Sequence, residues 1–195
     1  MKKRNTTISR NTGETRISLS VDLDGTGEAS ISTGLGFLDH MLTALSKHSR
    51  MDISLTCEGD LEVDDHHTAE DCALALGGAL DEILGDRRGI ERFGYAYAPL
   101  DEALARAVVD LSGRPTASVS LGLRGERVGA LATENIAHVL QSLAMTSRST
   151  IHVDVLKGEN DHHRAEAAFK ALALALRQAV SPSGQESVPS TKGVL

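Results

Sequence analysis

Two spacings of apolar residues along this chain predict helices and strands in a regular order. In the segments that begin at Phe37 and Ile136, apolar residues recur every three or four positions, as on one face of a helix. Alanine- and leucine-rich segments at 68–84 and 164–180 predict two longer helices. The sequence therefore predicts four helices, two in each half of the chain.

Strict alternation of apolar and polar residues predicts strands that bury one face. Four segments show this alternation: 17–23, 53–57, 105–111 and 151–155. Turns such as Asp24-Gly25 separate several strands, and Asp65 and Asp161 precede the longer helices as expected N-caps. A sheet with one apolar face needs a helical layer over it, so we expect an α+β sandwich of antiparallel strands and helices, made twice.

The helix and strand patterns of the first half recur in the second, which indicates a duplication. Each half has one histidine in its first helix, then a strand, then a His-His-x-x-Glu sequence. The single and paired histidines are similarly spaced, from His40 to His66 and from His138 to His162. We expect one domain over 1–195, with pseudo-repeats at about 1–93 and 94–181 and an irregular C-terminal tail at 182–195.

Composition narrows the classes of function. The net charge of −7 gives no reason to expect a nucleic-acid partner. No apolar run is long enough to span a membrane, and no apolar segment follows the basic residues 2–4, so we expect neither a membrane span nor a signal peptide. Cys57 and Cys72 have no metal or disulfide spacing, so we expect reduced thiols in a cytoplasmic protein.

The His-His-x-x-Glu sequences are the strongest candidates for chemistry. Each helical residue advances by about 100°, so His66 and Glu70 share a face, whereas His67 points about a quarter turn away. Two adjacent histidines of one helix therefore do not easily bind the same ion. In the simplest arrangement, His66 and Glu70 bind one metal and His67 binds another. Imidazole together with carboxylate suits Mn, Fe, Co, Ni or Zn rather than Mg or Ca.

The two halves together supply eight candidate metal ligands: His40, His66, His67, Glu70, His138, His162, His163 and Glu166. If the duplication is respected, one metal takes His40, His67, His162 and Glu166, and the other takes His66, Glu70, His138 and His163. Four protein ligands would leave two positions of an octahedral ion open, as a catalytic site requires. A lone histidine beside an apolar stripe is more often a surface or capping residue, and His48 and His152 keep that interpretation.

A second motif suggests a different enzyme class. The segment 21–26 contains Asp-x-Asp-Gly-Thr, which is typical of haloacid-dehalogenase-type phosphatases. No alternating strand–helix pattern of a nucleotide-type fold follows it, and a hairpin turn at Asp24-Gly25 explains the motif better. A metal-storage or structural cage is the other alternative, since it would also need interfacial histidine and glutamate but no phosphate clamp.

Five segments together resemble the imidazoleglycerol-phosphate dehydratases of histidine biosynthesis, over essentially the whole chain: 36–41, 64–71, 110–115, 160–166 and 189–195. The resemblance implies a hydro-lyase with a duplicated ferredoxin-like fold, similar to the second domain of ribosomal protein S5, with helices between two antiparallel sheets or on one face. It also implies two Mn²⁺ ions per active site, held by the two ligand sets above, at subunit interfaces of a homo-24-mer.

The reaction of that family suggests a mechanism. The substrate is a phosphorylated imidazole, and the proton that it loses lies next to no carbonyl, so the ring must be the electron source. We hypothesise that both ring nitrogens bind the two metals, which favours the imidazolate. Loss of the adjacent hydroxide then gives a diazafulvene, and loss of the next proton gives an enol that becomes imidazoleacetol phosphate.

The resemblance also assigns residue roles. A positioned carboxylate must move protons, and Glu14 is the candidate, with Glu166 assisting and the ligands His67 and His163 in the same catalytic set. The phosphate is expected to be held by Arg92, Arg114, Ser190 and Lys192, with Lys170 nearby. Without the resemblance, Glu14 would be a surface residue, Arg92 and Arg114 would be solvated, and the tail would fray.

Overall fold

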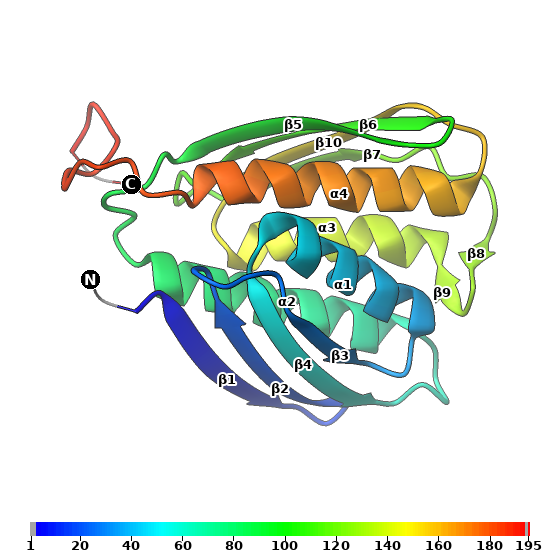
Figure 1. The fold of residues 1–195 in the computed structure, drawn as a ribbon. Coiled ribbons are helices and arrows are strands. Elements are labelled where there is room, and N and C mark those ends of the chain that lie inside the picture. The colour runs from blue at the N-terminus through cyan, green and yellow to red at the C-terminus, as the bar shows by residue number, and fades with distance from the viewer. Residues whose placement is uncertain (1–2, 194) are drawn as a thin grey trace.

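Two four-stranded sheets enclose four helices in a computed structural model that describes residues 3–193 and 195 (Figure 1). The first-half sheet lies on one side of the helices and the second-half sheet on the other. Helix α1 packs against α4, and α2 packs against α3, so the two halves meet through their helices. The expected α+β class is confirmed, with the helices in the interior.

The first half contributes strands in the order β1 (Asn5–Asn11), β2 (Thr15–Asp22), β4 (Asp52–Gly59) and β3 (Ala29–Ser32). Its helices are α1 (Gly36–Ser49) and α2 (His66–Leu84). Strands β1, β2 and β4 are antiparallel, whereas β3 runs parallel to β4.

The second half repeats this order with β5 (Phe93–Leu100), β6 (Ala103–Asp110), β10 (Thr150–Lys157) and β7 (Thr116–Ser120). Its helices are α3 (Thr133–Thr146) and α4 (Asp161–Ala179), and a small hairpin of β8 (Arg127–Val128) and β9 (Leu131–Ala132) precedes α3. Strand β7 runs parallel to β10. Both sheets are therefore mixed, and the expectation of purely antiparallel sheets is corrected at β3 and β7.

The core is aliphatic and rich in alanine, as the scarcity of aromatic residues requires. Leu19 and Val21 of β2 and Ala105 and Val109 of β6 are fully buried against the helical layer. Small residues let the layers approach closely: a Cβ placed on Gly94 of β5 would collide with the backbone of α4. This close packing holds α4, which carries three of the candidate ligands, against the second-half sheet.

Asp65 occupies the N-cap position of α2, as expected, but its side chain makes no capping hydrogen bond, and the expected N-cap Asp161 is wrong. The carboxylate of Asp65 accepts the backbone N–H of Ala132 rather than capping α2. Asp161 lies inside α4, and its carboxylate accepts the N–H groups of the 124–125 segment. Asn160 caps α4 instead, since its Oδ1 accepts the N–H groups of the paired histidines. Both aspartates hold the segment before α3, a contact between distant parts of the chain that spacing does not reveal.

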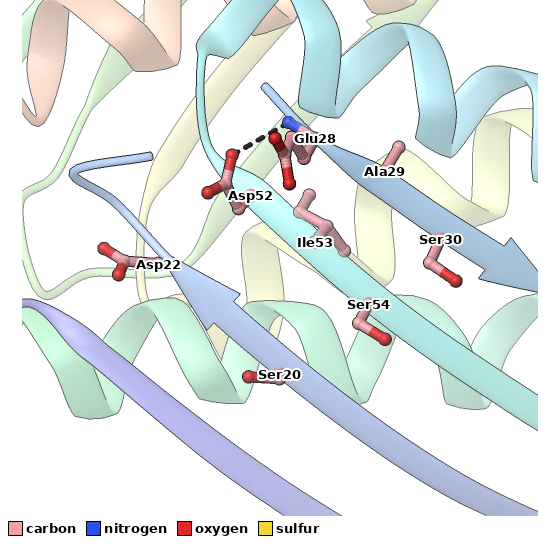
Figure 2. A pocket seen from close by; sticks show the side chains of 8 residues that line it. All are labelled: Ser20, Asp22, Glu28, Ala29, Ser30, Asp52, Ile53 and Ser54. Carbon is pink, nitrogen blue, oxygen red and sulfur yellow. Dashed lines mark hydrogen bonds between the residues drawn. The ribbon is translucent and has the colours of Figure 1, made fainter. Parts of the chain in front are cut away.

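The expected hairpin at Asp24-Gly25 is also wrong, because β2 and β3 are not neighbours in the sheet. The connection instead crosses the end of β4, where Asp52 Oδ1 accepts the N–H groups of Thr26, Gly27 and Glu28 at 2.8–2.9 Å. Figure 2 shows Asp52 and Glu28 beside a hollow lined by β2, β3 and β4. None of the histidines lines this hollow, so the candidate chemistry lies elsewhere.

The tail forms no helix or strand within the described residues, as expected, apart from a single bridge between Pro182 and Ile90. None of the helices in the described part of the chain is both long and apolar enough to cross a membrane.

Candidate metal centres

The first cluster of candidate ligands lies where α1 meets α4. His40 of α1 faces His162 and Glu166 of α4, and one ligand atom from each lies within 4.8 Å of the others. The Nε2 atoms of His40 and His162 lie 3.0 and 3.2 Å from Glu166 Oε2. Three ligands from two helices therefore converge on one point.

The second cluster is the counterpart of the first, where α2 meets α3. Here His138 of α3 faces His66 and Glu70 of α2, again within 4.8 Å. His138 Nε2 lies 3.0 Å from Glu70 Oε1, and the rings of His66 and His138 stack with centroids 4.9 Å apart. In both clusters the first histidine of the pair and the glutamate four residues later share a helix face, as predicted.

The second histidine of each pair lies outside these clusters within the described chain. His67 Nδ1 lies 3.0 Å from Asp60 Oδ2, and His163 Nδ1 lies 2.7 Å from Glu102 Oε2. The other ring nitrogens face carboxylates at longer range, with His67 Nε2 3.6 Å from Glu14 Oε1. The structure thus brings together three members of each predicted set of four and keeps the fourth apart.

The first cluster carries its own counter-charge. Lys170 Nζ lies 2.7 Å from Glu166 Oε1. Burial alone would raise the pKa of Glu166, but hydrogen bonds from Lys170 and His40 lower it to about 2. Glu166 is therefore an anion at neutral pH and is ready to bind a cation.

The two clusters differ in what orients their histidines. His66 Nδ1 lies 2.9 Å from Asn135 Oδ1, one turn before His138 on α3. The corresponding residue of α1 is Phe37, whose ring meets the ring of His162 edge-on at 5.0 Å. A hydrogen bond orients one ligand and an aromatic contact orients the other.

The donor sets fit a transition metal. Each cluster offers two imidazole nitrogens and a carboxylate, a mixture that suits Mn, Fe, Co, Ni or Zn better than Mg or Ca. Each Glu carboxylate lies within 3.8 Å of both histidines of its cluster, so the three side chains already point toward a common centre.

The expected phosphate-binding residues separate into two places. Arg92 forms a fork on Asp110, with contacts of 2.7 and 3.1 Å, and donates to the carbonyl of Pro189, which draws the tail beside it. Arg114 also faces Asp110, at 3.8 Å. These residues and the adjoining Ser190 and Lys192 lie at the C-terminal end of α4, whereas Lys170 lies beside the first cluster.

Comparison with known proteins resolves the family. The model of the imidazoleglycerol-phosphate dehydratase family matches residues 33–176, most of the chain. The chain belongs to the imidazoleglycerol-phosphate dehydratase family. The expected resemblance and hydro-lyase class are confirmed, and the phosphatase alternative is wrong because neither the fold nor the family supports it.

Several members of this dehydratase family are similar to nearly all of this chain. The imidazoleglycerol-phosphate dehydratase of Candida glabrata is 56% identical, with 96% of this chain and 98% of the relative covered. That of Phytophthora nicotianae is 59% identical over 98% of this chain, which spans only 42% of that longer relative. The solved dehydratase from Pyrococcus furiosus has a TM-score of 0.83 and 39% identity, with 96% of this chain and 100% of that chain covered.

The residues that surround the candidate ligands were not predicted from the sequence: Asp60, Glu102, Asn135 and Phe37. Asp60 and Glu102 lie in loops, where no periodicity marks a residue as inward-facing. Asn135 and Phe37 could have been found, since each lies three residues before the single histidine of its helix, one turn away.

Proposed function

We propose that this chain dehydrates imidazoleglycerol phosphate to imidazoleacetol phosphate in histidine biosynthesis, with two Mn²⁺ ions per active site. The observation that carries the proposal is the pair of clusters, each with two imidazoles and one carboxylate converging from two helices. Family membership supports the proposed reaction, and the two clusters support the proposed positions of the ions.

Each ion would be held by four protein ligands. One set consists of His40, His162, Glu166 and, from another copy of the chain, His67. The other set consists of His66, Glu70, His138 and His163 of another copy. The separation of His67 and His163 from the clusters of their own chain supports this sharing between subunits, as does their position at the first turns of α2 and α4.

The phosphate residues support the same assembly. Glu166 and Ala179 lie thirteen residues apart on α4, which corresponds to about 20 Å along the helix axis. Arg92 donates its backbone N–H to Ala179 O, so the cationic end and the first cluster lie at opposite ends of one helix. The three-carbon chain between the ring and the phosphate of the substrate is far shorter. A complete site therefore needs several copies, consistent with the proposed homo-24-mer.

Two divalent ions at the ring would supply the Lewis acidity that favours the imidazolate form of the substrate. The imidazolate ring would then expel the neighbouring hydroxide to give a diazafulvene, and loss of the proton on the next carbon would give the enol. The reaction therefore needs one group to donate a proton to the leaving hydroxide and one to remove the carbon-bound proton. Glu14 is the proposed acid/base: its side chain is about half exposed, and its carboxylate lies 3.6 Å from His67 Nε2, beside a ligand position.

Glu166 is better suited to binding than to moving protons, because its pKa of about 2 keeps it ionised. Arg92, Arg114, Ser190 and Lys192 would hold the phosphate, Arg92 and Arg114 through guanidinium groups already gathered around Asp110. Lys170 would serve as a nearby cation. A cytoplasmic location fits the two buried, unbridged thiols.

The experiment that tests this proposal follows metal content and product formation together. Chelation of the purified protein should remove both, and Mn²⁺ but not Mg²⁺ should restore both. Glu14→Gln should retain the metal of the parent and lose turnover by at least about 100-fold, the lower range for a general acid or base. Full activity of the metal-free protein would contradict the metal role, and near-normal turnover of Glu14→Gln would remove Glu14 from the mechanism.

A further inference from the structure

The two halves of the chain each have a glutamate at the same place in their first hairpin. Glu14 immediately precedes Thr15, the first buried residue of β2, and Glu102 immediately precedes Ala103, the first buried residue of β6. The two strands share the same alternation and the same neighbours in their sheets. Glu14 and Glu102 are therefore equivalent positions that can be compared directly.

Glu102 is held in place by hydrogen bonds. Its Oε2 lies 2.7 Å from His163 Nδ1, and its Oε1 accepts the backbone N–H groups of Glu159 and Asn160 at 3.1 and 3.0 Å. These hydrogen bonds fix the Glu102 carboxylate, which joins the β5–β6 turn, the start of α4 and the ring of His163.

Glu14 has no such attachment. Its carboxylate makes no hydrogen bond within the described residues, and its side chain is 53% exposed. The ring that corresponds to His163 is His67, and its Nδ1 is taken by a different residue, Asp60, at 3.0 and 3.2 Å. The side chain of Asp60 is only 20% exposed. In the first half, the carboxylate that holds the histidine ring is therefore that of Asp60, which follows β4, and Glu14 makes no such hydrogen bond.

An ionised carboxylate can only accept a hydrogen bond, so each Nδ1 beside one must donate its proton. The proton on Nδ1 leaves the lone pair of Nε2 free, which is the form of imidazole that binds a metal. The same contact fixes the plane of the ring, and such carboxylate–histidine–metal arrangements raise the basicity of the ligand. In both halves this applies to the histidine that points away from its own cluster.

We propose that Asp60 and Glu102 are positioning residues that hold His67 and His163 with Nε2 free and correctly aimed for a metal shared with another copy of the chain. A corollary is that Asp60 takes the role in the first half that Glu102 has in the second, which leaves Glu14 unattached for proton transfer. The inference rests on the proposed metal sites and adds two residues to them.

Asp60→Ala gives the sharpest test, because within the described chain the carboxylate of Asp60 hydrogen-bonds only to His67. The affinity for Mn²⁺ of the chelated and reloaded protein is measured by calorimetric titration, together with the unfolding temperature of the metal-free form. We expect the Mn²⁺ affinity of the sites that include His67 to fall about 10- to 100-fold, with little change in the unfolding temperature of the metal-free form. Asp60→Asn, which keeps one acceptor oxygen, should fall between the parent and Asp60→Ala.

Glu62→Ala is the matched control, since Glu62 lies two residues further along the same loop, is exposed and forms no side-chain hydrogen bond among the described residues. Its Mn²⁺ affinity should equal that of the parent. If the parent binds Mn²⁺ and Asp60→Ala binds it equally well, the positioning role is overturned and the metal sites stand. If the parent binds no Mn²⁺, the metal sites and this inference fall together. Should Asp60→Ala not fold, parent-like affinity of Asp60→Asn overturns the inference.

Discussion

The two members of each adjacent histidine pair face different partners. The first member joins the glutamate four residues later and a histidine from a neighbouring helix, and the second member turns toward a loop carboxylate. The sequence predicted this division, because a step of about 100° separates adjacent helical side chains. It could not predict Asp60 or Glu102, because their positions depend on how distant loops fold back onto α2 and α4.

The attachment of Glu102 predicts a dependence of stability on pH. Its folded pKa of about 2 lies below the ordinary value of 4.5, so its charge stabilises the fold fully above pH 4.5. That contribution is lost as the pH falls through 4.5 toward 2, because the folded form then gains the proton too. In metal-free protein, Glu102→Gln should therefore unfold at a lower temperature than the parent at pH 6–7, and the difference should vanish near pH 2.

Thermal unfolding followed by circular dichroism across that pH range measures the difference. Glu62→Gln removes the same charge from an exposed side chain and should track the parent throughout. A gap between Glu102→Gln and the parent that persists unchanged at pH 2 would show that the contribution does not depend on the charge of Glu102.

At the scale of elements, the contact between α2 and α3 depends on a residue without a side chain. A Cβ on Gly77 would lie 2.7 Å from Leu143 O and closer still to Thr146 Oγ1, whereas a Cβ on the adjacent Gly78 would meet nothing within 4 Å. Both glycines lie inside α2, where alanine favours the helix by about 1 kcal/mol. Alanine at Gly78 therefore changes stability through helix propensity alone, whereas alanine at Gly77 also disturbs the packing between α2 and α3.

Gly78→Ala should raise the free energy of unfolding by about 1 kcal/mol through propensity alone. Gly77→Ala should lower it by about 1–3 kcal/mol, because the added methyl group forces α2 and α3 apart. Since these helices carry the second cluster, Gly77→Ala should also weaken Mn²⁺ binding. Denaturant unfolding of the two metal-free variants provides the comparison, and equal stability would show that the helix contact tolerates a methyl group.

The elements themselves were largely predictable from the sequence, whereas their directions and connections were not. Helical spacing and alternation located all four helices and the central strands β2, β4, β6 and β10, because each buries one face, but they did not locate the edge strands β1 and β5. The edge strands β3 and β7 are only four and five residues long, and a pattern of burial does not encode whether a strand runs parallel to its neighbour. Asp65 and Asp161 resemble caps in sequence, but they bind a loop that is distant along the chain.

At the scale of the molecule, the duplication explains why there are two clusters. We propose that the repeats divide near residue 93, which the equal strand order of the two sheets supports. Packing through the helices brings α1 onto α4 and α2 onto α3, so each cluster takes its ligands from both halves. A single repeat would therefore lack both clusters.

We propose that one chain cannot form a complete site. The variant His162→Ala lacks an intact first cluster but keeps His67. The variant His67→Ala keeps an intact first cluster but lacks His67. The two variants would be co-expressed with different affinity tags, and assemblies that carry both tags would be purified and assayed for dehydration of imidazoleglycerol phosphate. Sharing between copies predicts that each variant alone is inactive and that mixed assemblies recover activity, because some interfaces then pair an intact cluster with an intact His67. Mixed assemblies as inactive as either variant alone would contradict it.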